Sequence, residues 1–264
     1  MKGRYAMSDN IANLDPAKVL RRTGMLYGVL SEGGLPWSAF QQPIDDPALR
    51  ARLVKNWLAG VPEVTVPYGE TPAKRAFEIV RTAYGPDLVT QLLGYTFGQG
   101  ERKMLEVVPY PTDLLERHAD THILVPRHLA ATMMSIKGVK VVRQKNLFWD
   151  QNWYHNEDLG CRPCGSGWMF LRKGKVHGTV NLPRSEQIRC LLLGERVPYG
   201  IEVTYATILH KLVTDEWLFS RWLRCQDIDS HGNRLNVGVL EGQLDVYCSW
   251  DDRPNPSIGL ASAW

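Results

Sequence analysis

The most regular pattern of apolar and polar positions lies between Arg196 and Val213. Apolar residues recur there at helical spacing and predict a helix over 199–213 with one apolar stripe, made of Ile201, Tyr205, Ile208, Leu209 and Leu212. Pro198 suits the first turn of this helix, because the N–H that proline lacks would have no helical partner there.

The first 100 residues carry three helix starts of one kind. A helix N-cap residue followed by proline occurs at Asp15-Pro16, at Asp46-Pro47 and at Thr71-Pro72. Apolar residues follow each start at helical spacing, such as Phe77, Val80 and Tyr84 after the third. The pattern therefore predicts a helical region over residues 1–100.

From residue 101 the pattern favours strands separated by short helical patches. The stretch 165–182 reads as a hairpin with its turn at Lys173-Gly174. The other predicted strands are 104–108, 122–125, 222–228, 235–240, 244–249 and 258–261, and 137–142 is predicted as a further strand or a loop edge. Residues 101–264 are thus predicted to form an α+β domain, in which the 199–213 helix packs against a small twisted antiparallel sheet.

Composition limits the classes of function. The chain has 264 residues, 44% of them hydrophobic, and a formal net charge of +3. This charge is too small to predict a nucleic-acid partner, and no basic run occurs. No apolar run approaches the roughly 18 residues of a spanning helix, and the N-terminus lacks a hydrophobic secretory segment. We therefore expect no membrane span, and a cytoplasmic or virion-associated protein.

Cysteine and histidine spacing suggests possible metal ligands. Five cysteines at irregular spacing do not form a complete disulfide framework. Cys161 and Cys164, in a Cys-x-x-Cys-Gly turn, could offer two thiolates to zinc, which needs four ligands. A second such pair is absent from the sequence, so we expect two plain thiols and no cofactor, with zinc as the alternative. Three further candidates for a metal are His118, His122 and His128.

Two segments resemble the formylglycine-generating-enzyme-like branch of the C-type-lectin fold. The signature Arg-Leu-Pro-Thr-x-x-Glu-Trp-x-Tyr-Ala is matched by Arg196, Pro198, Glu202, Tyr205 and Ala206, with departures at Val197, Tyr199 and Val203. The segment 250–260 resembles the polar loop and last strand that close such domains, although Ala261 stands where arginine is usual. The resemblance implies a C-type-lectin-like ligand-binding domain over residues 101–264.

The same fold is used by variable proteins of diversity-generating retroelements, which display a diversified face near the C-terminus. The chain from Thr121 onward also resembles uncharacterised bacterial proteins of small-genome candidate phyla. The resemblance implies a non-catalytic protein that binds a macromolecular ligand, protein or glycan. The residues expected on its variable face are Asp229, His231, Asn233, Asn236, Tyr247, Ser249, Asp251, Asp252, Arg253 and Asn255. Those expected in the scaffold between them are Val237, Gly238, Leu244, Val246, Trp250, Ile258 and Gly259.

Alternatives remain at this stage. Alternation of polar and apolar residues also marks any half-exposed strand. Lectin-like binding without diversification is a second possibility. A third is a metal-dependent oxidase of the same fold, for which Cys225 and Cys248 would have to hold copper. The variable-face hypothesis predicts that nine of these polar residues, all except Ser249, gather on one exposed surface. It also predicts that Trp250 and Ile258 are core residues, each costing roughly 2–5 kcal/mol when cut to alanine.

Overall fold

The computed structural model describes residues 69–250 and 253–264. All of these described residues belong to one compact unit, Thr65–Trp264. The helices predicted after Asp15-Pro16 and Asp46-Pro47 lie outside the described residues. The predicted boundary at residue 100 falls within this unit, where residues 69–100 share one hydrophobic core with the rest.

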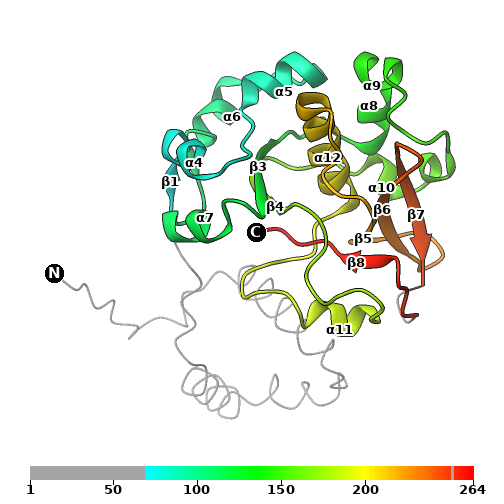
Figure 1. The fold of residues 1–264 in the computed structure, drawn as a ribbon. Helices are drawn as coiled ribbons and strands as arrows, with labels where there is room; N and C mark the ends of the chain where they lie inside the picture. The colour runs from blue at the N-terminus through cyan, green and yellow to red at the C-terminus, as the bar shows by residue number, and fades with distance from the viewer. Residues whose placement is uncertain (1–68, 251–252) are drawn as a thin grey trace, which may run out of the picture. The chain divides into compact units, whose positions relative to one another are not determined.

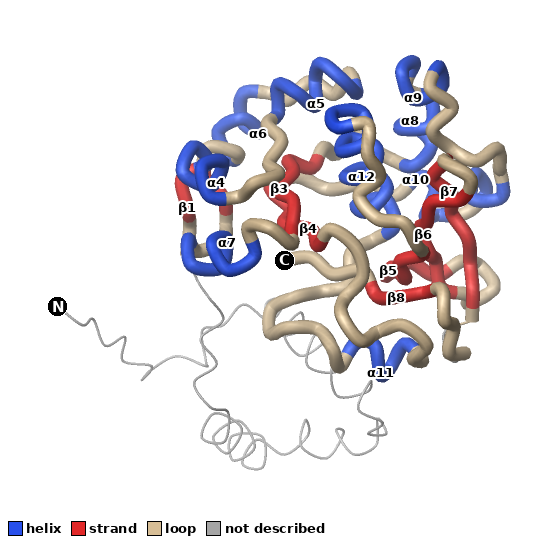
Figure 2. The backbone as a smooth tube through the Cα atoms, viewed as in Figure 1, coloured by secondary structure: helices blue, strands red, loops and turns tan. Residues whose placement is uncertain are grey.

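Mixed α and β structure with small sheets makes up this unit (Figures 1 and 2). The helices are α4 (Ala73–Ile79), α5 (Pro86–Leu93), α6 (Gln99–Met104), α7 (Thr112–His118), α8 (Met133–Gly138), α9 (Lys140–Gln144), α10 (Asp158–Cys161), α11 (Arg184–Ile188) and α12 (Gly200–Thr214), with a 3₁₀ turn, η2 (Trp153–Asn156). The strands are β1 (Thr71–Pro72), β2 (Val107–Val108), β3 (His122–Arg127), β4 (Gly167–Arg172), β5 (Trp222–Ile228), β6 (Arg234–Leu240), β7 (Gln243–Ser249) and β8 (Ile258–Leu260).

The largest sheet has four strands in the order β7-β6-β5-β8. Strands β5, β6 and β7 form an antiparallel meander, which confirms the three strands predicted there. Strand β8 was also predicted, but it runs parallel to β5 instead of completing an antiparallel sheet. The chain leaves β7 and returns to the free edge of β5, and such a crossover needs a longer connection than a hairpin turn.

Helix α12 is the centre of the unit. Every residue from Gly200 to Leu209 is buried, so the helix is enclosed on all sides over this length and not only along the predicted stripe. It packs against β5 and β6 on one side, and the Tyr205 hydroxyl donates to the Pro126 carbonyl of β3 at 2.7 Å. Figure 1 shows α12 between the β3–β4 pair and the four-stranded sheet.

A cluster of two partly exposed arginines around the buried carboxylate of Glu202 fixes the start of α12. The Glu202 carboxylate accepts two hydrogen bonds of 2.6 Å from the Arg196 guanidinium and one of 2.9 Å from Arg127. It also accepts a bond from the Tyr199 backbone N–H at 2.9 Å. Burial opposes ionisation of Glu202, but these donors outweigh it and hold the pKa of the carboxyl below its usual range. The matched signature residues Arg196 and Glu202 therefore have a structural role here.

Two of the predicted strand assignments are wrong. Residues 137–142 lie in α8 and α9, where the Thr132 side chain caps α8 by accepting from the Ser135 N–H at 3.0 Å. This cap outweighs the β propensity of the valines. The predicted 165–182 hairpin is also absent: β4 pairs with β3, and the Val176 N–H instead donates to the Leu260 carbonyl at 2.8 Å.

Two further predictions are shortened. In the predicted strand 104–108, Met104 ends α6 and β2 comprises Val107 and Val108. The helix predicted after Thr71-Pro72 is α4, which ends at Ile79, before Val80 and Tyr84. Both of these residues are nevertheless buried in the core.

Candidate functional site

The two faces of the four-stranded sheet differ in character, because successive strand residues point to opposite faces. The face toward α12 is apolar and buried, and its members are Leu223, Cys225, Leu235, Val237, Leu244 and Val246. The opposite face carries polar and aromatic side chains, among them Trp222, Arg224, Asn236, Tyr247 and Ser249. The pairing register places Arg224 beside Asn236 and Asn236 beside Tyr247.

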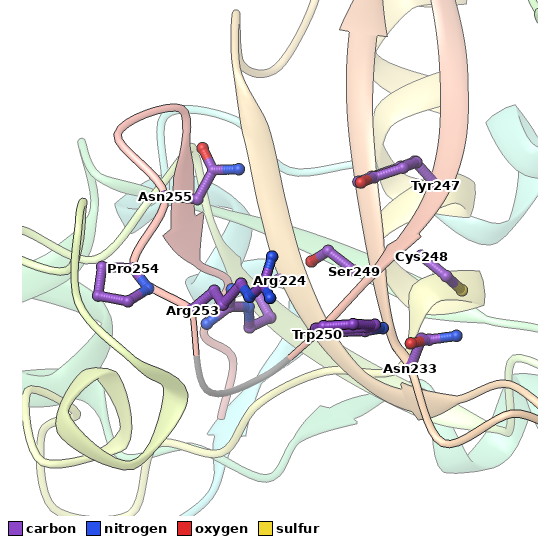
Figure 3. Close-up of a pocket in the computed structure, with 9 residues that line it drawn as sticks. All are labelled: Arg224, Asn233, Tyr247, Cys248, Ser249, Trp250, Arg253, Pro254 and Asn255. Atoms are coloured by element: carbon purple, nitrogen blue, oxygen red, sulfur yellow. The ribbon is translucent and has the colours of Figure 1, made fainter.

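A hollow of about 400 Å³ opens at one end of this second face (Figure 3). Its lining residues are Arg224, Asn233, Tyr247, Cys248, Ser249, Trp250, Arg253, Pro254 and Asn255. Five of the ten predicted site residues are among them, namely Asn233, Tyr247, Ser249, Arg253 and Asn255. The structure thus brings together side chains from the end of β7, from the turn before β6 and from the segment before β8.

The β5–β6 turn holds two more predicted residues, but they do not line the hollow. The Asp229 carboxylate accepts hydrogen bonds from the backbone N–H groups of His231 at 2.9 Å and Asn233 at 2.8 Å. It also accepts one from the Asn233 side-chain amide at 3.0 Å. Asp229 therefore closes the turn, which is a structural role that its position in the sequence did not indicate.

Asn236 was predicted to be exposed, and this is wrong. Its side chain is 0% exposed, and its amide donates to the Arg234 and Tyr247 carbonyls and to the Ser249 hydroxyl. A buried amide is tolerated when hydrogen bonds replace its contacts with water. Asn236 consequently supports the wall of the hollow from below. Asp251 and Asp252 lie outside the described residues.

Trp250 was assigned to the scaffold, and this is also wrong. Its side chain is 60% exposed and lines the hollow. The Arg253 guanidinium lies over the indole ring, 4.4 Å from its centroid, as a cation–π pair. Ile258, by contrast, is 2% exposed, as the prediction required. The alternation of strand residues could not place Trp250, because it follows the last residue of β7.

A second aromatic side chain stands at the hollow. Tyr247 is 49% exposed and meets the Trp222 ring edge to face, with centroids 5.6 Å apart. Trp222 in turn lies over Gly238, where a Cβ atom would come within 2.5 Å of the indole. Gly238 therefore allows the close approach that positions Trp222 and, through it, Tyr247.

Arg224 is a residue of the site that sequence reasoning missed. It is fully buried, and its guanidinium donates to the Gln187 side-chain oxygen of α11 at 3.0 Å. Period-two alternation along β5 places Arg224 on the same face as Trp222 and Gln226, and this signal could have identified it. Arginine at the base of the hollow adds positive charge to a wall of amides, hydroxyls and aromatic rings.

Cys248 lines the hollow, and its thiol is a side-chain group that can act as a nucleophile when it is ionised. Burial, followed by the nearby Asp229 carboxylate, raises the pKa of Cys248 well above its usual range, so it remains a thiol. The two cysteines that copper chemistry would require lie on β5 and β7, with β6 between them. Strands two places apart are separated by roughly 9.5 Å, which is too far for two thiolates to share one ion. This geometry does not support the oxidase alternative.

The other proposed metal ligands do not gather either. Cys161 is exposed at the end of α10, while Cys164 is buried and its backbone N–H donates to the Ala131 carbonyl. The His118 and His122 rings are 5.1 Å apart, whereas His128 stacks on Tyr95 elsewhere. Within 69–250 and 253–264, no three His, Cys, Asp or Glu side chains are close enough together to hold a metal ion.

Comparisons with known proteins add no assignment. In the described part of the chain no helix combines the length and apolarity needed to cross a membrane. Searches with protein-family models, curated sequences and solved structures return no match to this chain.

Proposed function

We propose that this chain is a non-catalytic ligand-binding protein and that its ligand occupies the hollow beside β7. One observation carries the proposal. Five residues chosen from the sequence as members of a binding face, all within residues 233–255, line one hollow together with the exposed indole of Trp250. Exposed aromatic side chains at a concave surface are typical of binding sites.

The chemistry of the wall suits adaptable recognition. Tyrosine and tryptophan offer rigid contact area at low entropic cost, and asparagine and serine offer hydrogen bonds in either direction. Tyr247 and Trp250 provide the first kind of contact, and Asn233, Ser249 and Asn255 provide the second. The wall of the hollow combines polar groups with exposed aromatic rings, so we propose a macromolecular ligand, protein or glycan, that inserts a side chain or a sugar unit.

We further propose that the unit has the C-type-lectin-like fold of the formylglycine-generating-enzyme-like branch, and that its tail is diversified by a retroelement. Support comes from the separation of roles on one sheet. Its α12 face is buried and apolar, while the residues of the hollow project from the other face and from the segment that follows. Changes at the hollow can then alter the ligand without altering the core.

A pair of displayed libraries tests the binding proposal. The first randomises three exposed lining residues, Tyr247, Arg253 and Pro254. It keeps Asn233, Ser249 and Asn255, because their side chains form hydrogen bonds within the unit. The control library randomises three exposed α9 residues, Lys140, Arg143 and Gln144. Both libraries are selected on one immobilised protein and on one polysaccharide.

We expect most members of the hollow library to melt near the parent temperature and to yield binders whose affinity depends on the three positions. Equal yields from the two libraries, or general unfolding of the hollow library, would count against a ligand face. Diversification has its own test at the DNA level. A near-copy of the 3′ end of the gene beside a reverse-transcriptase gene would support it, and the absence of both from a complete genome would refute it.

A further inference from the structure

A second hollow, of about 310 Å³, lies where the loop after β4 meets the segment leading into β5. Its lining residues are Lys173, Gly174, Lys175, Phe219, Ser220, Arg221 and Leu223. Three of the seven carry a positive charge and none carries a negative charge. Leu223 and Arg224 are consecutive on β5, so the two hollows lie against opposite faces of this strand.

The three cations form no ion pair with the residues that the structure describes. In the part of the chain that the structure describes, no carboxylate oxygen lies within 4.0 Å of the side-chain nitrogens of Lys173, Lys175 or Arg221. Asp120 is the acidic group that acts on Lys173, but its carboxylate is bound to Arg81 at 2.6 Å. Three like charges around one hollow repel one another, and a bound anion relieves that repulsion.

Contacts of the backbone and of the side-chain stem place Lys173 and Lys175 beside the hollow. The Lys173 N–H donates to the Thr121 carbonyl at 2.8 Å, and Gly174 has a φ of 119°, which favours glycine. The side chain of Lys175 begins directly over Gly259 of β8, where an added Cβ would come within 2.5 Å of the Lys175 Cβ. The glycine thus makes room for the lysine stem beside the hollow.

The remaining lining residues supply complementary contacts. The Ser220 hydroxyl is exposed and has no hydrogen-bond partner among the described residues, so it is free to donate. Phe219 and Leu223 are buried apolar residues that form a wall of the hollow. An anion in this place would therefore meet two ammonium groups, one guanidinium fork and one hydroxyl, with apolar surface next to them.

We propose that this second hollow binds a small organic phosphate, with its phosphate group among Lys173, Lys175 and Arg221 and its organic part against Phe219 and Leu223. A phosphate monoester is dianionic above pH 7 and has three acceptor oxygens, which match three cations better than a carboxylate or a sulfate ester does. The hollow is larger than an inorganic phosphate ion, and this leaves space for the organic part.

Titration calorimetry of the full chain with phenyl phosphate at pH 8 and low salt tests this assignment. The variant Lys173→Gln/Lys175→Gln/Arg221→Gln removes the three cations. The control Lys103→Gln/Lys140→Gln/Arg189→Gln makes the same change in net charge at three exposed positions elsewhere. Melting curves check that both variants fold.

We expect one phenyl phosphate per chain, an affinity at least about tenfold lower in the first variant, and a change of less than about twofold in the control. Phenyl sulfate, benzoate and inorganic phosphate should each bind at least about threefold more weakly than phenyl phosphate. The proposal is overturned by equal losses in both variants, by equal binding of phenyl sulfate or benzoate, or by no binding at millimolar phenyl phosphate. If inorganic phosphate bound as tightly as phenyl phosphate, the proposed contact of an organic part with Phe219 and Leu223 would be refuted.

Discussion

Two polar regions of this unit use similar residues for different purposes. The buried carboxylates of Glu195, Glu202 and Asp227 each meet an arginine: Arg172 at 3.3 Å, Arg196 at 2.6 Å and Arg162 at 2.8 Å. The hollow beside β7 also combines arginine with amides and hydroxyls, but its tyrosine, tryptophan and Arg253 are exposed.

The difference follows from what each charge contacts. A carboxylate that is removed from water must be compensated by internal donors, so its partners are fixed by the fold. Exposed side chains are compensated by water and can exchange water for a ligand. The comparison therefore separates polar residues that maintain the fold from those that are available for recognition, and it predicts opposite consequences of substitution.

The largest effect is expected for Glu202→Gln. The Glu202 side chain is 2% exposed, and glutamine would leave Arg196 and Arg127 without a counter-charge at the start of α12. We expect a loss of about 3 kcal/mol in the free energy of unfolding, measured by urea titration, because breaking a buried ion pair removes its compensation. The control Glu106→Gln, at an exposed residue, should stay within about 0.5 kcal/mol. A loss below about 1 kcal/mol for Glu202→Gln would contradict the distinction between polar residues that maintain the fold and those that are available for recognition.

The second-largest effect is expected from acid, which should lower the free energy of unfolding through the buried groups His122 and Glu195. Burial lowers the pKa of His122 from 6.5 to about 4, with Glu195 acting in the opposite direction. Because the folded pKa lies below the unfolded one, this contribution is complete above about pH 6.5 and is lost as the pH falls toward 4. Burial would raise the pKa of Glu195, but His122, the Leu192 N–H and Arg172 together lower it to about 2. Its stabilisation is then lost below about pH 4.3.

The expected loss from His122 between pH 6.5 and 4 is about 3 kcal/mol. His118 and His210 also have a pKa lowered by burial and titrate in the same direction, so the test is a comparison of variants. Unfolding free energies measured from pH 8 to pH 3 should show a smaller loss in this window for His122→Gln. His231→Gln, exposed in the β5–β6 turn, should follow the parent curve. Parallel curves for all three proteins would contradict the assignment.

A third substitution links the sheet to the hollow. In Gly238→Ala the new methyl group would collide with the Trp222 indole, 2.5 Å away, and the cost should be about 1–3 kcal/mol. The displaced indole should also move Tyr247, which would change its NMR signals. Gly100→Ala in α6 meets nothing within 4 Å and should instead stabilise by up to about 1 kcal/mol. Equal effects of the two substitutions would show that Trp222 adjusts freely.

The sequence predicted those parts whose signal is local. The helix after Pro198 and the strands of the β5–β7 meander were predicted from periodicity and turn residues, because each can be recognised within about fifteen residues. The pairing of β3 with β4 was not predicted, because the two strands are some forty residues apart and no local pattern indicates that they pair. The predicted hairpin at Lys173-Gly174 failed for the same reason: a turn was present, but a distant strand took the partner's place.

The candidate site shows the same limit. Residue type and alternation identified five lining residues, but they could not tell that Asn236 lies beneath the surface or that Asp229 closes a turn. Burial of Asn236 depends on its two neighbouring strands and on Ser249, which are tertiary contacts. Trp250 was misplaced because it was assigned to the scaffold between polar positions, whereas its position after the end of β7 leaves it exposed.

The smallest effect on stability, and the most informative one, is expected for Trp250→Ala. Sequence reasoning placed this residue in the core with a cost of roughly 2–5 kcal/mol. The structure exposes 60% of it and pairs its ring with the exposed guanidinium of Arg253, so the cost should be below about 1 kcal/mol. The matched control is Trp168→Ala, since Trp168 is 3% exposed and its indole N–H donates to the Leu105 carbonyl. It should cost about 3–5 kcal/mol.

Urea titration of both tryptophan variants measures this contrast, and binders selected from the hollow library supply the second measurement. If Trp250 serves recognition, alanine there should weaken those binders at least about tenfold, as expected for an aromatic anchor, while the unfolding midpoint hardly moves. A large loss of stability for Trp250→Ala would show that this residue serves to stabilise the fold. A small loss of stability with unchanged binding would leave Trp250 outside the ligand site, and the hollow would then have Tyr247 as its main aromatic contact.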